Sequence, residues 1–301
     1  MSEKTAQTVR SINDANIAFM RGEGARVPFR KHIRALTDPV LRGEERRTPD
    51  FHEAMIGACV IGRAFPNRAR GHLKRLEEIC TEVGNPKRFQ VFQAMVNAYL
   101  APERLSGHGY QSDSLADLDL LNVAKGLQDV TAPLRDLGYE YFVNSGSLLG
   151  LTREGGLIEH DDDIDLAVVL KAKSEKKAIT EWQKLRDQLS ELGAVDESAR
   201  KTVVCKLNKV SGVMVDLFPL WVQSGKIYVY PYSYGDLKKK DLLPLGSCER
   251  TGLPVPADPE AFLEQNYGPG WREPDPYFRF PWQEAKQKFR TFLEGSENAS
   301  T

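Results

Sequence analysis

Cysteine is scarce in this chain, and its positions exclude the structural roles of cysteine clusters. The 301 residues include four cysteines, Cys59, Cys80, Cys205 and Cys248, and no two of them form a C-x-x-C pair. Neither a zinc knuckle nor a disulfide framework is therefore expected. We interpret the four cysteines as free thiols in a reducing compartment.

Long apolar segments are also absent. No stretch approaches the roughly 18 apolar residues that a membrane-spanning helix requires. The first residues carry charges where a signal peptide would have its apolar core, at Glu3, Lys4, Arg10 and Asp14. These two absences predict a cytoplasmic protein without a transmembrane segment.

The chain has no excess charge of either sign. Lysine and arginine total 41 and aspartate and glutamate total 42, which gives a net charge of -1. Such a balance argues against a protein that mainly coats nucleic acid or an anionic membrane. Hydrophobic residues at 41% and charged residues at 28% are ordinary for a globular protein and exclude extensive disorder.

The two signs of charge are divided unevenly along the chain, which predicts two modules. Residues 1–110 have 18 basic and 12 acidic side chains, whereas residues 111–301 have 23 basic and 30 acidic ones. A linker with two glycines and no periodic apolar residues spans residues 106–114, across this boundary. We therefore expect one module over residues 1–110 and a second domain over residues 111–301.

The first module is predicted to be helical. Apolar residues recur at steps of three and four around residues 55–60, 71–83 and 89–99, which is typical of short antiparallel helices. A basic run accompanies them, and it could bind a phosphate-rich polymer or form a solvated helix face: Arg63, Arg68, Arg70, Lys74 and Arg75. The solvated face is the simpler interpretation.

The second domain begins with helical spacing and then changes to extended structure. Apolar residues over 118–137 predict a helix, with a capping segment at residues 112–114. Residues 139–143 read Tyr-Glu-Tyr-Phe-Val and predict a strand, because aromatic and β-branched residues favour sheets.

Four aspartates directly precede and enter a continuous apolar run. They are Asp161, Asp162, Asp163 and Asp165, and the apolar run extends to Leu170. Side chains alternate along a strand, so Asp163 and Asp165 share one face, roughly 7 Å apart. Oxygen ligands favour Mg²⁺ or Mn²⁺. A solvated acidic turn would explain Asp161 and Asp162, but it would not explain Asp165 inside the apolar run.

Two further features predict a cleft for an anionic ligand. The pair Gly146 and Ser147 follows a strand and opens an apolar helical turn, where backbone N–H groups can bind phosphate. Asp216 interrupts the apolar stretch of residues 212–221, and a buried carboxylate needs a partner. That partner is either the same metal site or a salt bridge to Lys206 or Arg153.

These motifs resemble the LicD/fukutin family of the nucleotidyltransferase-fold superfamily. The resemblance covers roughly residues 115–280 and rests on residues 141–150, Arg153, residues 158–165, residues 215–219 and the late Tyr267-Gly268 with Trp271 and Pro274. It implies an α+β fold, with a mixed sheet flanked by helices, preceded by the helical module. Two departures are Glu159-His160, where the family has Pro-Trp, and Glu154 after the arginine.

The resemblance implies a transferase of substituted phosphate groups. Family members move a phospho-alcohol, such as phosphocholine or a glycerol or ribitol phosphate, from a CDP-activated donor to a glycan hydroxyl and release CMP. The acceptor would be a glycan or glycolipid of capsule or lipopolysaccharide biosynthesis, reached by peripheral association with the inner face of the membrane. No nucleic-acid partner is expected.

The resemblance also implies roles for individual residues around Mg²⁺ or Mn²⁺, most simply as two ions. Asp163 and Asp165 would be metal ligands, and Asp216 the third ligand and proton acceptor. Gly146 and Ser147 would cradle the donor diphosphate, and Arg153 would stabilise charge on the transferred phosphoryl group. Asp161 and Asp162 would tune the field or orient the strand.

Two other functions are compatible with the same residues. A nucleotidyltransferase would place the nucleotide of an NTP on a small molecule or RNA and release pyrophosphate. A non-catalytic glycan-binding protein could retain the fold, although it has no reason to keep mutually repelling acids. His160 beside the acids is interpreted as a wall residue rather than as a base or zinc ligand.

Overall fold

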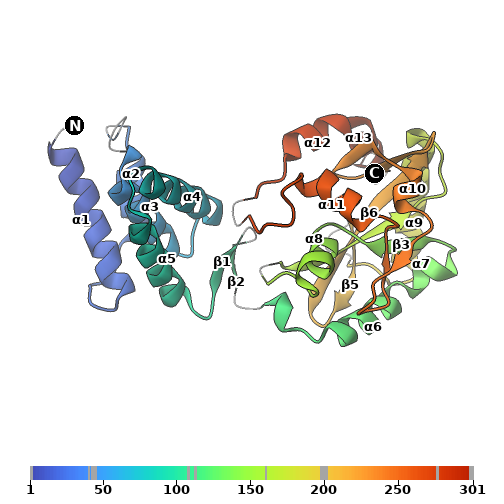
Figure 1. The fold of residues 1–301 in the computed structure, drawn as a ribbon, viewed down its shortest axis with the longest axis horizontal. Helices are drawn as coiled ribbons and strands as arrows, with labels where there is room; N and C mark the ends of the chain where they lie inside the picture. Colours follow the sequence, from blue (N-terminus) through green and yellow to red (C-terminus); the bar gives the residue numbers. More distant parts are fainter. Residues whose placement is uncertain are drawn as a thin grey trace. The chain divides into compact units, whose positions relative to one another are not determined.

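The computed structural model divides the chain into two compact units, Met1–Asp113 and Ser114–Thr301 (Figure 1). It describes residues 3–39, 41, 46–106, 109–111, 114–159, 161–196, 203–275 and 278–297. All four cysteines lie in this described part and are free thiols, three of them buried.

The first unit is built on helices, as predicted. Its elements are α1 (Glu3–Met20), α2 (Phe29–Thr37), α3 (Pro49–Ile61), α4 (Pro66–Glu82), α5 (Pro86–Leu100) and a small hairpin of β1 (Arg104–Ser106) and β2 (Gly109–Gln111). Proline opens α3, α4 and α5, because the first helical position needs no N–H donor. Residues 51–60 of α3 are all buried, so α3 forms the centre of this core.

Polar groups are also buried in this first core. Glu53 is buried, and Arg88 donates to its two carboxylate oxygens at 2.7 and 2.8 Å. His52 is buried as well, and its Nδ1 lies 2.8 Å from Nδ1 of His72. These pairs join α3 to α4 and α5.

The second unit begins with helices that lead into the sheet. A 3₁₀ turn (Leu115–Asp117) precedes α6 (Leu120–Val130), and α7 (Ala132–Asp136) follows. The helix expected over 118–137 is therefore divided, with Pro133 in the first turn of α7. Asp119 caps α6 by accepting hydrogen bonds from Leu121 and Asn122. Of the capping segment that we expected at residues 112–114, residues 112 and 113 lie outside the described residues.

A six-stranded mixed sheet forms the centre of the second unit, which confirms the predicted α+β class. The strands are β3 (Glu140–Val143), β4 (Asp163–Val169), β5 (Cys205–Val210), β6 (Val213–Gln223), β7 (Lys226–Val229) and β8 (Ser233–Lys238). Their order is β3-β4-β6-β7-β8, with β5 also paired to β6. Only β4 and β6 run parallel among the described strand pairs of this sheet.

Helices and a small second hairpin complete the second unit. They are α8 (Ser145–Leu149), a π-helical turn (Gly150–Glu154), α9 (Glu175–Glu191), α10 (Lys239–Leu242), β9 (Gly246–Ser247), β10 (Pro254–Val255), α11 (Pro259–Tyr267), α12 (Trp282–Lys288) and α13 (Arg290–Glu297). On the sheet, Trp221 stacks on Tyr228 at 5.1 Å and on Phe292 of α13 at 4.9 Å between ring centroids. Trp182 of α9 is fully buried in the same core.

Candidate metal centre

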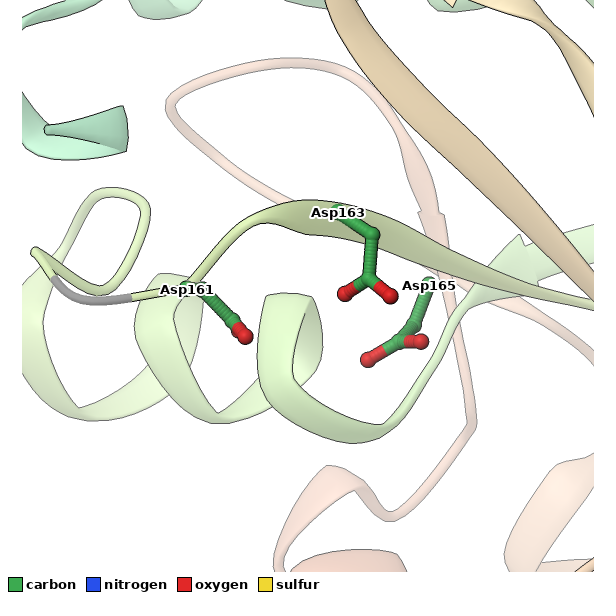
Figure 2. A group of neighbouring side chains, drawn as sticks. All are labelled: Asp161, Asp163 and Asp165. Atoms are coloured by element: carbon green, nitrogen blue, oxygen red, sulfur yellow. The ribbon is translucent and has the colours of Figure 1, made fainter. Parts of the chain in front are cut away.

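The beginning of β4 brings three carboxylates together. One oxygen from each of Asp161, Asp163 and Asp165 lies within 4.8 Å of the other two. Figure 2 shows the three side chains directed toward a common space beside the helical turns that follow β3. Asp165 is buried at 8% exposure, whereas Asp161 and Asp163 are half-buried. The alternation of side chains along a strand predicted that Asp163 and Asp165 would share one face. Asp161, two residues before Asp163, joins the same group.

The turn after β3 holds Asp165 in place. The N–H of Asn144 donates to the Asp165 carbonyl at 2.9 Å, and the N–H of Gly146 donates to its carboxylate Oδ2 at 2.8 Å. The N–H of Asp165 in turn donates to the Ser147 hydroxyl at 2.9 Å. Backbone and side chain of Asp165 are therefore both fixed before any ligand binds.

These contacts bear on our prediction for Gly146 and Ser147. Both residues are buried at the beginning of α8, beside the acids. Their hydrogen-bonding groups, however, orient Asp165, a role that the sequence did not indicate. Diphosphate binding by this turn stays a prediction.

The charges of the neighbouring acids act on the pKa of Asp165, and a bound cation would oppose their effect. Burial raises the pKa of Asp165 well above its ordinary value, the charges of Asp163 and Asp161 raise it further, and the Gly146 N–H partly opposes this. A divalent cation between the carboxylates would remove the repulsion. Three carboxylates form a donor set that suits Mg²⁺ or Mn²⁺ better than softer metals.

Asp216 has one of the two kinds of partner that the sequence left open. The parallel register places Asp216 directly beside Asp165, on the same face of the sheet. Its carboxylate, however, accepts hydrogen bonds from Lys206 Nζ at 2.9 and 3.2 Å. This salt bridge gives the buried carboxylate a partner, and metal binding by Asp216 stays a prediction. Among the described residues, the group of three carboxylates contains Asp161 and not Asp216.

Arg153 contacts the beginning of the chain segment that follows α11. It lies in the π-helical turn, where its Nη1 donates to the Trp271 carbonyl at 3.1 Å and its Nε pairs with Glu154 at 2.7 Å. Glu154 is one of the departures from the family pattern, and it is now seen to restrain the arginine. Stabilisation of a phosphoryl group by Arg153 stays a prediction.

Two tyrosines beside the acids were not assigned to the site from the sequence. The Tyr232 hydroxyl donates to the buried Asn144 side chain, which adjoins the turn that holds Asp165. Burial raises the pKa of Tyr267 well above its ordinary value, and the charges of Asp165 and Asp161 raise it further while Arg153 opposes this. Tyr267 is therefore within electrostatic range of the acids. His160 lies outside the described residues.

The fold agrees with a known family. Residues 138–258 match the family model described as LicD/FKTN/FKRP, nucleotidyltransferase domain. The matched segment runs from β3 to β10 and contains the acids, Gly146, Ser147 and Arg153. The domain that it forms belongs to the LicD family, and this membership suggests a phosphotransferase that acts on glycans.

Comparison with curated proteins gives no match. In the described parts of the chain, no helix is both long enough and apolar enough to cross a membrane.

Proposed function

We propose that the chain is a metal-dependent transferase that moves a phospho-alcohol from a CDP-activated donor to a hydroxyl of a glycan or glycolipid, with release of CMP. The observation that carries this proposal is the approach of the Asp161, Asp163 and Asp165 carboxylates within 4.8 Å in a LicD-family domain. Burial and the charges of Asp163 and Asp161 disfavour the ionised form of Asp165, and a divalent cation bound between the three carboxylates would compensate this cost.

Each residue of the centre has a proposed task. Asp161, Asp163 and Asp165 hold Mg²⁺ or Mn²⁺, which when bound neutralises the donor diphosphate and lowers the pKa of the acceptor hydroxyl. Gly146 and Ser147 keep Asp165 oriented toward that ion. Arg153, whose side chain contacts the Trp271 carbonyl and Glu154, would stabilise charge on the transferred group.

Two residues next to the acids have proposed tasks in proton transfer and substrate binding. Asp216, which shares the sheet face of Asp165, is our candidate for accepting the hydroxyl proton. Tyr267 is a candidate contact for the donor or acceptor, because the charges of Asp165 and Asp161 are close enough to its hydroxyl to raise its pKa.

The test is a donor panel of CDP-choline, CDP-glycerol and CDP-ribitol with Mg²⁺ or Mn²⁺ and candidate glycan acceptors, followed by measurement of CMP. We expect CMP from at least one donor, dependent on the metal, and none from the Asp163→Asn variant. Pyrophosphate release from NTPs in place of CMP release would identify a nucleotidyltransferase instead. Absence of both, with glycan binding retained, would identify a binding protein.

A further inference from the structure

A large aromatic side chain of the second unit is open to solvent at the beginning of α12. Among the described residues of this unit, Trp282 is the only exposed aromatic side chain, with 50% of its surface accessible. Its ring contacts the Phe280 ring edge-on, at 4.9 Å between ring centroids. The backbone at Trp282 is anchored, because α12 contains the buried Ala285 and is followed by the buried Phe289. Trp282 therefore presents an apolar surface from an anchored position.

Trp282 is the outer member of a strip of aromatic side chains. Phe278 lies two residues before Phe280, and its ring contacts that of Tyr267 at 5.1 Å between centroids. We call this set the aromatic strip, and its members are Tyr267, Phe278, Phe280 and Trp282. The first three are half-buried, so the strip becomes exposed at Trp282. The Cα atoms of Phe278 and Trp282 are four residues apart and hence separated by at most about 14 Å.

The inner end of the aromatic strip lies beside the candidate metal centre. Tyr267 is the last residue of α11, and α11 packs against α8 (Figure 1). In α8, the N–H of Gly146 donates to the Asp165 carboxylate. Four residues after Tyr267, the Trp271 carbonyl accepts a hydrogen bond from Arg153 at 3.1 Å. The strip therefore leads from the candidate metal centre to the surface of the same unit.

The chemistry of the strip suits a glycan. C–H groups form one face of a pyranose ring, and they pack on the electron-rich face of an aromatic ring while the hydroxyls at the edge stay in water. Sugars are joined in a chain, so a row of aromatic rings can contact several of them in succession. A glycan bound along the strip would have its inner end at the candidate metal centre.

Two other kinds of partner fit the strip less well. A helix that lies on a membrane needs a continuous apolar face, whereas α12 has only Ala285 as an apolar residue after Trp282. A stable protein interface buries about 800 Å² on each partner. The other large apolar side chains that are exposed in the described part of this unit lie elsewhere, Leu121 on α6 and Leu192 at the end of α9.

We propose that the aromatic strip is a glycan subsite for the acceptor, and that a sugar ring of the glycan stacks on Trp282. This inference rests on the proposed function, because it states where the acceptor of that reaction binds. Trp282 contacts the glycan at a distance from the reacting atoms. It therefore determines the affinity for the acceptor rather than the rate of transfer.

The experiment measures binding of the full chain to an array of pyranose oligosaccharides, followed by calorimetric titration with the glycan that wild type binds best. Trp282→Leu keeps an apolar side chain but removes the aromatic face, whereas Trp282→Tyr keeps that face. Leu192→Ala changes another exposed apolar residue and is the matched control.

We expect the Kd of Trp282→Leu to rise about tenfold, which corresponds to about 1.4 kcal/mol. The Kd values of Trp282→Tyr and Leu192→Ala should stay within about threefold of wild type. Thermal unfolding checks that each variant is folded. If Trp282→Leu does not fold, Trp282→Gln replaces it, because glutamine suits an exposed helical position.

The inference is overturned if wild type binds no glycan, or if Trp282→Leu and wild type bind equally well. It is also overturned if Trp282→Leu loses binding to vesicles of equimolar phosphatidylcholine and phosphatidylglycerol while it retains the glycan, because the ring would then contact lipid. Failure of the proposed function gives a different result. Glycan binding through Trp282 without CMP release from any donor overturns the transferase and leaves the glycan subsite. CMP release with an unchanged acceptor KM in Trp282→Leu overturns the glycan subsite alone.

Discussion

Gly146 lies directly against Asp161. A methyl group added at Gly146 would stand 2.3 Å from Asp161 Oδ2 and 3.3 Å from Asp165 Oδ2. The first distance is too short for carbon and oxygen and the second is tight, so the glycine allows the turn after β3 and the acids before and within β4 to approach each other. The absence of a side chain at position 146 is therefore part of the geometry of the metal centre.

The first prediction follows from this contact. Gly146→Ala should displace the Asp161 carboxylate, weaken Mn²⁺ binding and lower the free energy of unfolding by about 1–3 kcal/mol, as overpacking usually does. Metal titration and thermal unfolding measure the two effects. Gly156→Ala is the matched control, because an added methyl group there meets no atom within 4 Å. Equal Mn²⁺ affinity in the two variants would contradict the prediction.

Adjacent aspartates provide a second test. Asp161 belongs to the cluster, whereas its neighbour Asp162 is exposed. Asp161→Asn should weaken Mn²⁺ binding by about tenfold or more, because affinity follows the number of charged ligands. Asp162→Asn removes the same charge one residue away and should change the affinity little. The prediction fails if the two variants weaken binding to the same extent.

A third prediction concerns stability without metal. The pKa of Asp165 is raised in the folded protein, so the folded state binds a proton more readily than the unfolded state. The ionised carboxylate therefore destabilises the fold, and this cost appears as the pH rises through the raised pKa. In metal-free buffer at neutral pH, Asp165→Asn should unfold at a higher denaturant concentration than wild type.

The same variant has a distinctive pH dependence. The difference in stability between Asp165→Asn and wild type should shrink as the pH falls, because wild type then becomes protonated at Asp165. Saturating Mn²⁺ should reverse the order of stability, since wild type alone gains from the ion. A stability difference that is independent of both pH and metal would refute the proposed electrostatic cause.

The fourth prediction concerns the histidine pair of the first unit. Burial lowers the pKa of His52 and of His72 to about 4. Their Nδ1 atoms are 2.8 Å apart, so one ring must donate and the other accept, which requires that at least one ring is neutral. Unfolded histidine titrates near about 6.5. The unfolded state therefore binds more protons between these values, and stability is lost as the pH falls from about 6.5 to about 4.

His72→Asn keeps a hydrogen-bonding side chain on α4 but removes one of the two titrating imidazoles. Its free energy of unfolding, measured by urea denaturation, should fall less steeply over this pH window than that of wild type. Parallel pH profiles of the two proteins would show that the pair does not titrate as described.

The sequence predicted the elements of the fold more completely than the contacts of the site. Apolar periodicity indicated α3, α4 and α5, and alternation along β4 placed Asp163 and Asp165 on one face. Asp161 was not assigned to the cluster, because it precedes the strand and its side chain lies against Gly146, which is distant in the sequence. A local pattern of residues does not specify such a contact across the chain.

The partner of Asp216 illustrates the same limit. Lys206 was one of the alternatives considered from the sequence, but choosing it requires the register between β5 and β6. That register contains an irregularity between Leu207 and Val210, which changes which residues face each other. Neither hydrophobic pattern nor residue type predicts such a shift.

The hairpin of β5 and β6 has a consequence for how the domain assembles. Only Ser211 and Gly212 separate the two strands, so Lys206 and Asp216 are brought together by a short-range loop closure. The parallel pairing of β6 with β4 spans a much longer stretch of chain and is entropically slower to form. Asp216 can therefore reach Asp165 with its charge already compensated, so the pairing of β6 with β4 adds no uncompensated carboxylate to the repulsion among the three clustered acids.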